Sequence, residues 1–87
     1  MSAEELSTKY IIAMEKVLTQ IIQSKGPLTI NDDSIEEVFG YVKAYLADAK
    51  YFHNQKKFET SLVSIAYCEG LLDALKLIGA AKIQTHL

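Results

Sequence analysis

Two acidic residues interrupt an otherwise apolar stretch, YCEGLLDALKLIG at residues 67–79. Glu69 and Asp73 are four residues apart, so they share one face of a helix, and Lys76 continues that row. Such a pair can hold a metal or a polar ligand only when further donors converge on it. The Glu-x-x-His pairs of di-metal helical bundles are missing from the sequence. The simpler interpretation is a solvated face with an Asp73–Lys76 pair, and we expect neither a metal nor another cofactor.

A second polar group forms if two helices make a hairpin. Asp48 lies at the edge of an apolar stripe, and an antiparallel partner helix can bring it near Tyr67. A tyrosine hydroxyl bonded to a carboxylate is a common way to satisfy half-buried polar groups. Two interpretations stay open: a structural hydrogen bond, or a small polar pocket made by Asp48, Tyr67 and Asp73.

The other reactive residue types form no recognisable catalytic pattern. His53 falls near the end of a predicted helix, where a histidine usually donates to a carbonyl or favours the helix dipole. Cys68 lies on a predicted core face, as an inert buried thiol does, and His86 lies in the C-terminal tail. Neither a nucleophile–histidine–acid spacing nor a phosphate-binding glycine loop is present. We therefore do not expect an enzyme.

Composition narrows the function classes further. The 87 residues suit a single domain, 49% apolar and 23% charged, with a net charge of −2. The nine basic residues are all lysines, so the arginine that usually reads phosphates and guanines is absent, and we expect no nucleic-acid partner. The lone cysteine suggests a reducing cytoplasm. The acidic N-terminus does not resemble a signal peptide, and no apolar run is long enough for a membrane span.

Apolar residues at three- and four-residue steps predict three helices, over residues 4–24, 35–54 and 58–78. Ser2 can cap the first, Gly26-Pro27 ends it, and Ser34 with Glu37 makes a capping box for the second. A polar turn at 54–57 joins the second to the third, which Gly79 ends before a fraying tail at 80–87. The predicted fold is therefore all-α, an up-down-up three-helix bundle.

The third predicted helix is apolar almost all the way round. A helix of this kind is usually buried on several sides, so it should be the central element of the bundle or face a second subunit. Gly70 and Ala74 are four residues apart, which lets another helix come close. We expect the interface, within the bundle or across a homodimer, to include Val63, Gly70, Ala74 and Leu77.

The stretch DAKYFHNQKKFETSLVSIAYCEGLLDALKLIG, residues 48–79, resembles the small archaeal family known as domain of unknown function 357. The resemblance implies a three-helix bundle of archaeal, cytoplasmic origin, and it transfers no catalytic residue. Cys68 stands where the family pattern has alanine. The positions that carry the likeness are Asp48, Ala49, Tyr51, Phe52, Phe58, Tyr67, Gly70, Leu71, Leu72, Asp73, Ala74 and Gly79.

Two hypotheses about function follow. The first is a non-enzymatic interaction or assembly module with a protein partner, which can be a second copy bound through the third helix. The second is a small-ligand-binding or enzyme-accessory domain with a polar pocket between the second and third helices.

Overall fold

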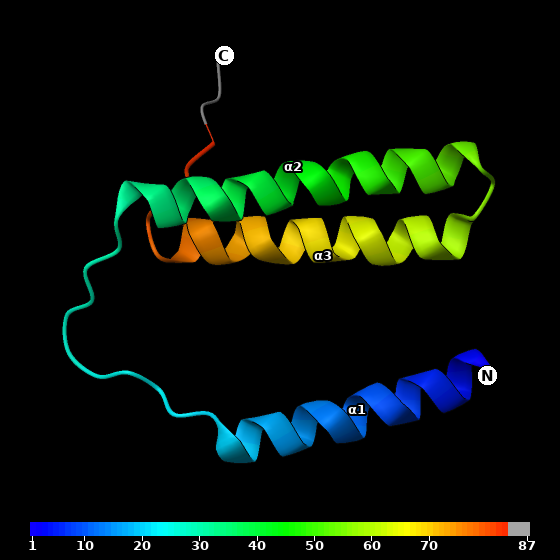
Figure 1. Cartoon of the computed structure of the whole chain (residues 1–87), viewed down its shortest axis with the longest axis horizontal. Coiled ribbons are helices and arrows are strands. Elements are labelled where there is room, and N and C mark those ends of the chain that lie inside the picture. Colours follow the sequence, from blue (N-terminus) through cyan, green and yellow to red (C-terminus); the bar gives the residue numbers. More distant parts are fainter. Residues whose placement is uncertain (84–87) are drawn as a thin grey trace.

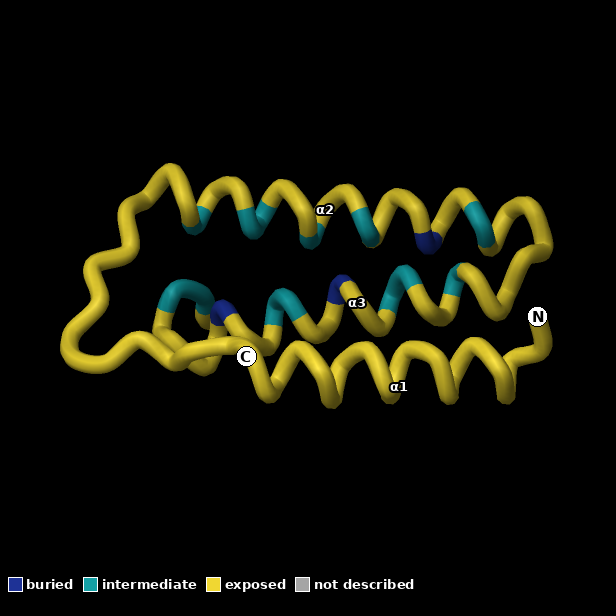
Figure 2. Tube along the Cα trace, turned by 60° about the horizontal axis from the view of Figure 1, so that its bottom comes forward, coloured by how far each residue is buried: buried dark blue, intermediate teal, exposed yellow. Residues whose placement is uncertain are grey.

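The computed structural model describes residues 1–83 and contains three helices: α1 (Ala3–Gln20), α2 (Asp32–Asn54) and α3 (Phe58–Leu77). The described residues include no strand. α2 and α3 form an antiparallel hairpin, and α1 runs in the same direction as α3 (Figure 1). α3 lies between the other two helices (Figure 2). The predicted all-α, up-down-up arrangement is confirmed.

The start of α1 follows from its first residues. The backbone N–H of Glu5 donates to Ser2 Oγ at 3.1 Å, which satisfies one of the free amides of the first turn. The end of α1 was predicted at residue 24, but the helix stops at Gln20 and Ile21 is extended. Ile21 and Ile22 are β-branched, lose rotamer freedom in a helix and have no packing partner here, so nothing offsets that loss.

α2 begins three residues before the predicted boundary. The cap is Asn31, whose Oδ1 accepts a hydrogen bond from Ser34 N at 2.8 Å, so the predicted capping box at Ser34 is wrong. Asparagine and serine cap equally well, and the earlier choice places Asp32 and Asp33 in the first turn, where the helix dipole favours negative charge.

The turn between α2 and α3 is a Schellman motif with lysine at its left-handed position. Lys57 N donates to Phe52 O at 2.9 Å and Lys56 N donates to His53 O at 3.0 Å. Lys56 has φ 61°, a conformation that favours glycine. The same motif closes α3: Ala80 N donates to Leu75 O, and Gly79 N to Lys76 O, with Gly79 at φ 80°.

The end of α3 was therefore predicted correctly within one residue, since Gly79 supplies the left-handed cap. Residues 80–83 follow without helix. The rest of the predicted tail, including His86, lies outside the described residues.

Replacing Lys56 by glycine tests the turn. Lys56→Gly should raise the free energy of unfolding by about 0.5–1 kcal/mol, because relief of the left-handed strain outweighs the extra chain entropy of glycine. Gly79→Ala, which adds strain at the matching position of α3, should lower it. Urea denaturation measures both, and a loss of stability in Lys56→Gly would contradict this account of the turn.

Small residues bring α2 and α3 into close contact. The residues buried in the described chain are Ala49, Cys68 and Leu75, all at this seam. Ser61 Oγ donates to Ala49 O at 2.7 Å, and Cys68 Sγ donates to Val42 O at 3.3 Å. Each bond reaches a backbone carbonyl of the facing helix, so the two backbones must lie close. Both donors and both acceptors are seven residues apart, the repeat that keeps two helices in contact along their length.

Overpacking the seam is expected to be costly. Ala49→Leu should destabilise the chain by about 1–3 kcal/mol, because Ala49 is buried where the two helix backbones meet. Ala44→Leu makes the same change at an exposed position of the same helix and should alter stability by less than about 0.5 kcal/mol. Thermal unfolding of the two variants measures the difference, and equal effects would refute close packing at Ala49.

α1 does not share this packing. All its residues are exposed (Figure 2), and no Cα atom of α1 lies within 8 Å of a Cα atom of α2 or α3. Residues 21–31 connect it to the hairpin without regular structure. The hairpin is thus the ordered core of the fold, and α1 is a helix held beside it by an extended connector.

Candidate functional site

One side of the hairpin carries several tyrosines. We call it the tyrosine flank, and it consists of Tyr41, Tyr45, Val63, Tyr67 and Leu71. The rings of Tyr45 and Tyr67 meet across the seam with centroids 4.4 Å apart, at a 40° tilt. Together with Val38, the tyrosines and Leu71 line an open hollow of about 410 Å³. A second hollow, of about 200 Å³, adjoins it at Tyr67, Gly70 and Leu71. The tyrosine flank is therefore apolar, aromatic and hollowed rather than filled.

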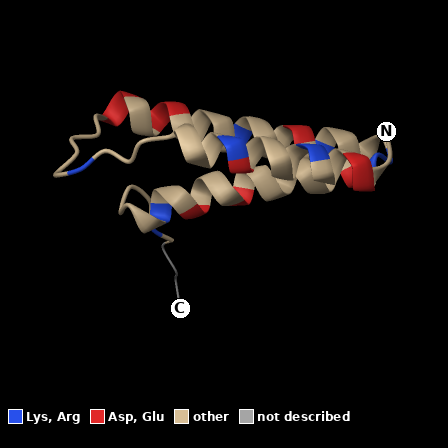
Figure 3. Ribbon diagram, turned by 90° about the horizontal axis from the view of Figure 1, so that it is seen from below, with Lys and Arg blue, Asp and Glu red and all other residues tan. Residues whose placement is uncertain are grey.

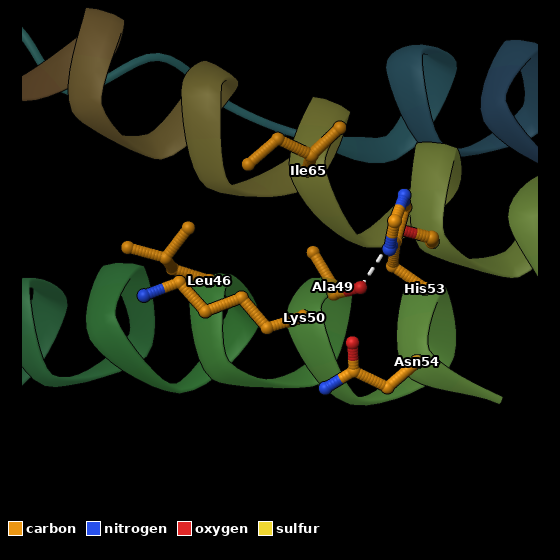
Figure 4. Close-up of a pocket in the computed structure, with 7 residues that line it drawn as sticks. Leu46, Ala49, Lys50, His53, Asn54 and Ile65 are labelled. Carbon is orange, nitrogen blue, oxygen red and sulfur yellow. Dashed lines mark hydrogen bonds between the residues drawn. The ribbon is translucent and has the colours of Figure 1, made fainter.

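The opposite side of the hairpin, the histidine flank, consists of Leu46, His53, Phe58, Leu62 and Ile65. His53 contacts Phe58 edge to face, with centroids 5.2 Å apart. Figure 4 shows the hollow on this side, of about 410 Å³, with Leu46, Ala49, Lys50, His53 and Asn54 from α2 and Ile65 from α3. The dashed line in that view is the Ser61–Ala49 hydrogen bond. α3 thus presents apolar residues at the seam and on both flanks.

The three seam contacts fix which residues of α2 and α3 lie level. Ala49 meets Ser61, Val42 meets Cys68 and Tyr45 meets Tyr67. The residue numbers within these pairs add up to 110, 110 and 112. A residue of α2 therefore lies level with the residue of α3 whose number, added to its own, gives about 111. We call this relation the level rule.

The expected polar residues do not converge. By the level rule Asp48 lies beside residue 63, ten residues from Asp73, which is about 15 Å along the helix axis. Asp73 pairs with Lys76 at 3.5 Å and its side chain is 65% exposed, as the solvated interpretation predicts. Asp48 is exposed, and Tyr67 packs on Tyr45. Neither carboxylate lines either of the two flank hollows of about 410 Å³.

Removing either charge should therefore change little. Asp48→Asn and Asp73→Asn should each alter the free energy of unfolding by less than about 0.5 kcal/mol, because both side chains are solvated and the Asp73–Lys76 ion pair is exposed. Denaturant titration at neutral pH measures this. A loss above 1 kcal/mol in both variants would indicate that the two carboxylates share a buried site.

The predicted interface residues are all exposed. Val63 is 69% and Leu77 is 87% exposed, and Gly70 and Ala74 lie open between them. A Cβ atom added at Gly70 would meet nothing within 4 Å. Within the chain, then, the Gly70–Ala74 pair does not serve helix packing, and the surface is available to something outside the hairpin.

α1 approaches the tyrosine flank only at one end. Ala3, Leu6, Ser7 and Tyr10 line a hollow of about 610 Å³ together with Glu59, Thr60 and Val63 of α3. The apolar side chains of α1 stay exposed, with Tyr10 at 67% and Met14 at 58%. α1 and α3 therefore present two apolar faces that are close but not joined.

Charges are spread in both signs over the helices rather than gathered in one patch (Figure 3). Among residues 1–83 there is no group of three or more His, Cys, Asp or Glu side chains placed to hold a metal ion. None of the helices in that part of the chain is long and apolar enough to cross a membrane. Cys68 is buried and free, as predicted.

Comparison with known families decides the relationship suggested by the sequence. The family model described as "Protein of unknown function (DUF357)" matches residues 9–81. The chain belongs to this family. The DUF357 match includes most of α1, the connector and the whole hairpin, so all three helices are part of the family pattern. No curated protein and no solved structure matches the chain.

The tyrosine flank is the feature that sequence reasoning missed in this DUF357 chain. Tyr41 and Tyr45 are four residues apart and share a helix face, which is a visible signal. Tyr67 joins them only when the level of α3 against α2 is known. That level depends on the seam contacts of Ser61 and Cys68, which spacing alone does not reveal.

Proposed function

We propose that this chain is a non-enzymatic helical interaction module that binds a protein partner through its exposed apolar faces. The observation that carries the proposal is the exposed area. The chain exposes 7952 Å², whereas a compact protein of 9.7 kDa exposes about 5,100 Å². Its radius of gyration is 16.2 Å, against about 12 Å for a compact domain of this length.

The excess is about 2,800 Å², and the large apolar side chains that lie exposed include many of α1, the connector and α3. Patches larger than a few hundred Å² on a folded protein usually mark a binding surface. Stable protein interfaces remove about 800 Å² from each partner, and obligate ones remove more. The area available is thus ample for a permanent partner.

α1 supplies a second argument. Helices in proteins gain most of their stability from packing an apolar face. An isolated 18-residue helix of ordinary composition is only marginally stable in water. No residue of α1 is buried in this chain. A partner surface that covers Leu6, Tyr10 and Val17 would supply the missing stabilisation.

A small-ligand or enzyme-accessory role is the second candidate. The hollow of the tyrosine flank favours it, since Tyr41, Tyr45 and Tyr67 offer aromatic faces with hydroxyl tips. The ligand suited to that lining is a flat apolar molecule rather than the polar one that Asp48 and Asp73 suggested. A cytoplasmic location is part of the proposal and is supported by the single, unpaired Cys68.

Site-specific photo-crosslinking in cells tests the interaction module. A photoreactive residue at Val63 or at Leu77 should yield a discrete protein adduct, because both side chains lie on the exposed apolar surface. The matched control is Lys16, which is exposed on the polar side of α1 and should yield none.

The adduct mass distinguishes a second copy from another protein. Absence of adducts at both apolar positions, together with a monomeric mass in sedimentation at all concentrations, would refute the interaction module. Chemical-shift changes at the tyrosines on addition of small aromatic compounds would then favour the ligand-binding role.

A further inference from the structure

The histidine flank needs a partner of its own. α1 approaches the hairpin at Val63, on the tyrosine side, and one helix cannot cover both sides of the hairpin. On the opposite side Phe58 is 53% and Leu62 is 66% exposed, beside Leu46. α1 therefore does not cover this flank.

Charged residues follow a matched pattern along the histidine flank. On α2, Glu36, Lys43 and Lys50 recur every seven residues next to Leu46, and on α3 Leu62, Glu69 and Lys76 recur in the same way next to Ile65. A seven-residue repeat keeps each set on one side of its helix. All six side chains are exposed.

The level rule places oppositely charged residues of the two helices at the same level. Glu36 is level with Lys76, Lys43 with Glu69, and the aliphatic stem of Lys50 with Leu62. Within the described residues of one chain these opposite charges do not pair; the ion pair formed there is Lys76–Asp73, inside α3. The complementarity is thus present but unused.

We propose that the histidine flank binds the same flank of a second copy of this chain, about a two-fold axis parallel to α2 and α3. This proposal rests on the interaction module and names its partner. A rotation about that axis keeps every residue at its level and lays α2 of one copy over α3 of the other.

In this dimer Lys43 meets the partner copy's α3 at the level of Glu69, and Glu36 meets it at the level of Lys76, each twice. Leu46, Phe58 and Leu62 fill the half of the interface nearer the turn. The two hairpins then form a four-helix bundle with antiparallel neighbours, while each α1 remains free for the outer, tyrosine side.

The area agrees with this arrangement. A homodimer of ordinary size removes about 800 Å² from each copy, well within the excess of about 2,800 Å². The faces of α1 and the tyrosine flank stay uncovered in this dimer.

Charge reversal with sedimentation equilibrium tests the dimer. The full chain should sediment as a dimer. Lys43→Glu and Glu69→Lys should each weaken dimerisation about tenfold or more, because each places like charges opposite each other. The double variant Lys43→Glu/Glu69→Lys should restore the wild-type dissociation constant. Lys16→Glu makes the same charge change on α1 and should leave the constant unchanged.

A wild-type chain that is monomeric up to high micromolar concentration would overturn the dimer, whereas the interaction module would survive if crosslinking still yields an adduct with another protein. A dimer that the single reversals do not weaken would also overturn the proposal. The proposal would also fail if the double variant restored only the unfolding temperature of a monomeric chain, because that result would place the Lys43–Glu69 pair within one chain.

Discussion

The close seam between α2 and α3 is the interaction on which the rest of this structure depends. Ala49, Ser61 and Cys68 are small enough to let two backbones meet, and the hydroxyl and thiol bond to carbonyls across the gap. Those contacts fix the level of one helix against the other. The tyrosine pair, both flanks and the matched charges all follow from that level.

A narrow seam of small side chains has a consequence for stability. It buries few carbon atoms, so the hydrophobic contribution within one chain is modest. Apart from Leu75, which the seam buries, many large apolar side chains lie exposed on α1 and on the two flanks. A chain that leaves most of its large apolar side chains exposed gains most of its burial by association. We regard this as the physical reason why an interaction module fits the structure better than a ligand site does.

Much of the fold was predictable because its signals are local. Gly79 marks the end of α3, the polar turn marks the hairpin, and apolar periodicity gives three helices in the right order. Errors arose where two residues compete for one role, as Asn31 and Ser34 do for the cap, and where packing decides, as at the early end of α1 after Gln20. The polar pocket was not assembled because its members are far apart along the axis. Spacing within one helix says nothing about the level of the facing helix.

Hydrogen exchange of each helix, followed by mass spectrometry at low and high protein concentration, tests the central claim most directly. The claim is that the seam holds α2 and α3 together while α1 and the flanks depend on a partner. Backbone amides at the seam should be protected even in dilute solution, whereas amides of α1 should exchange within seconds there and slow when a partner is bound. Protection of α1 equal to that of α2 and α3 at the lowest concentration would contradict the claim, because α1 would then be packed on its own chain.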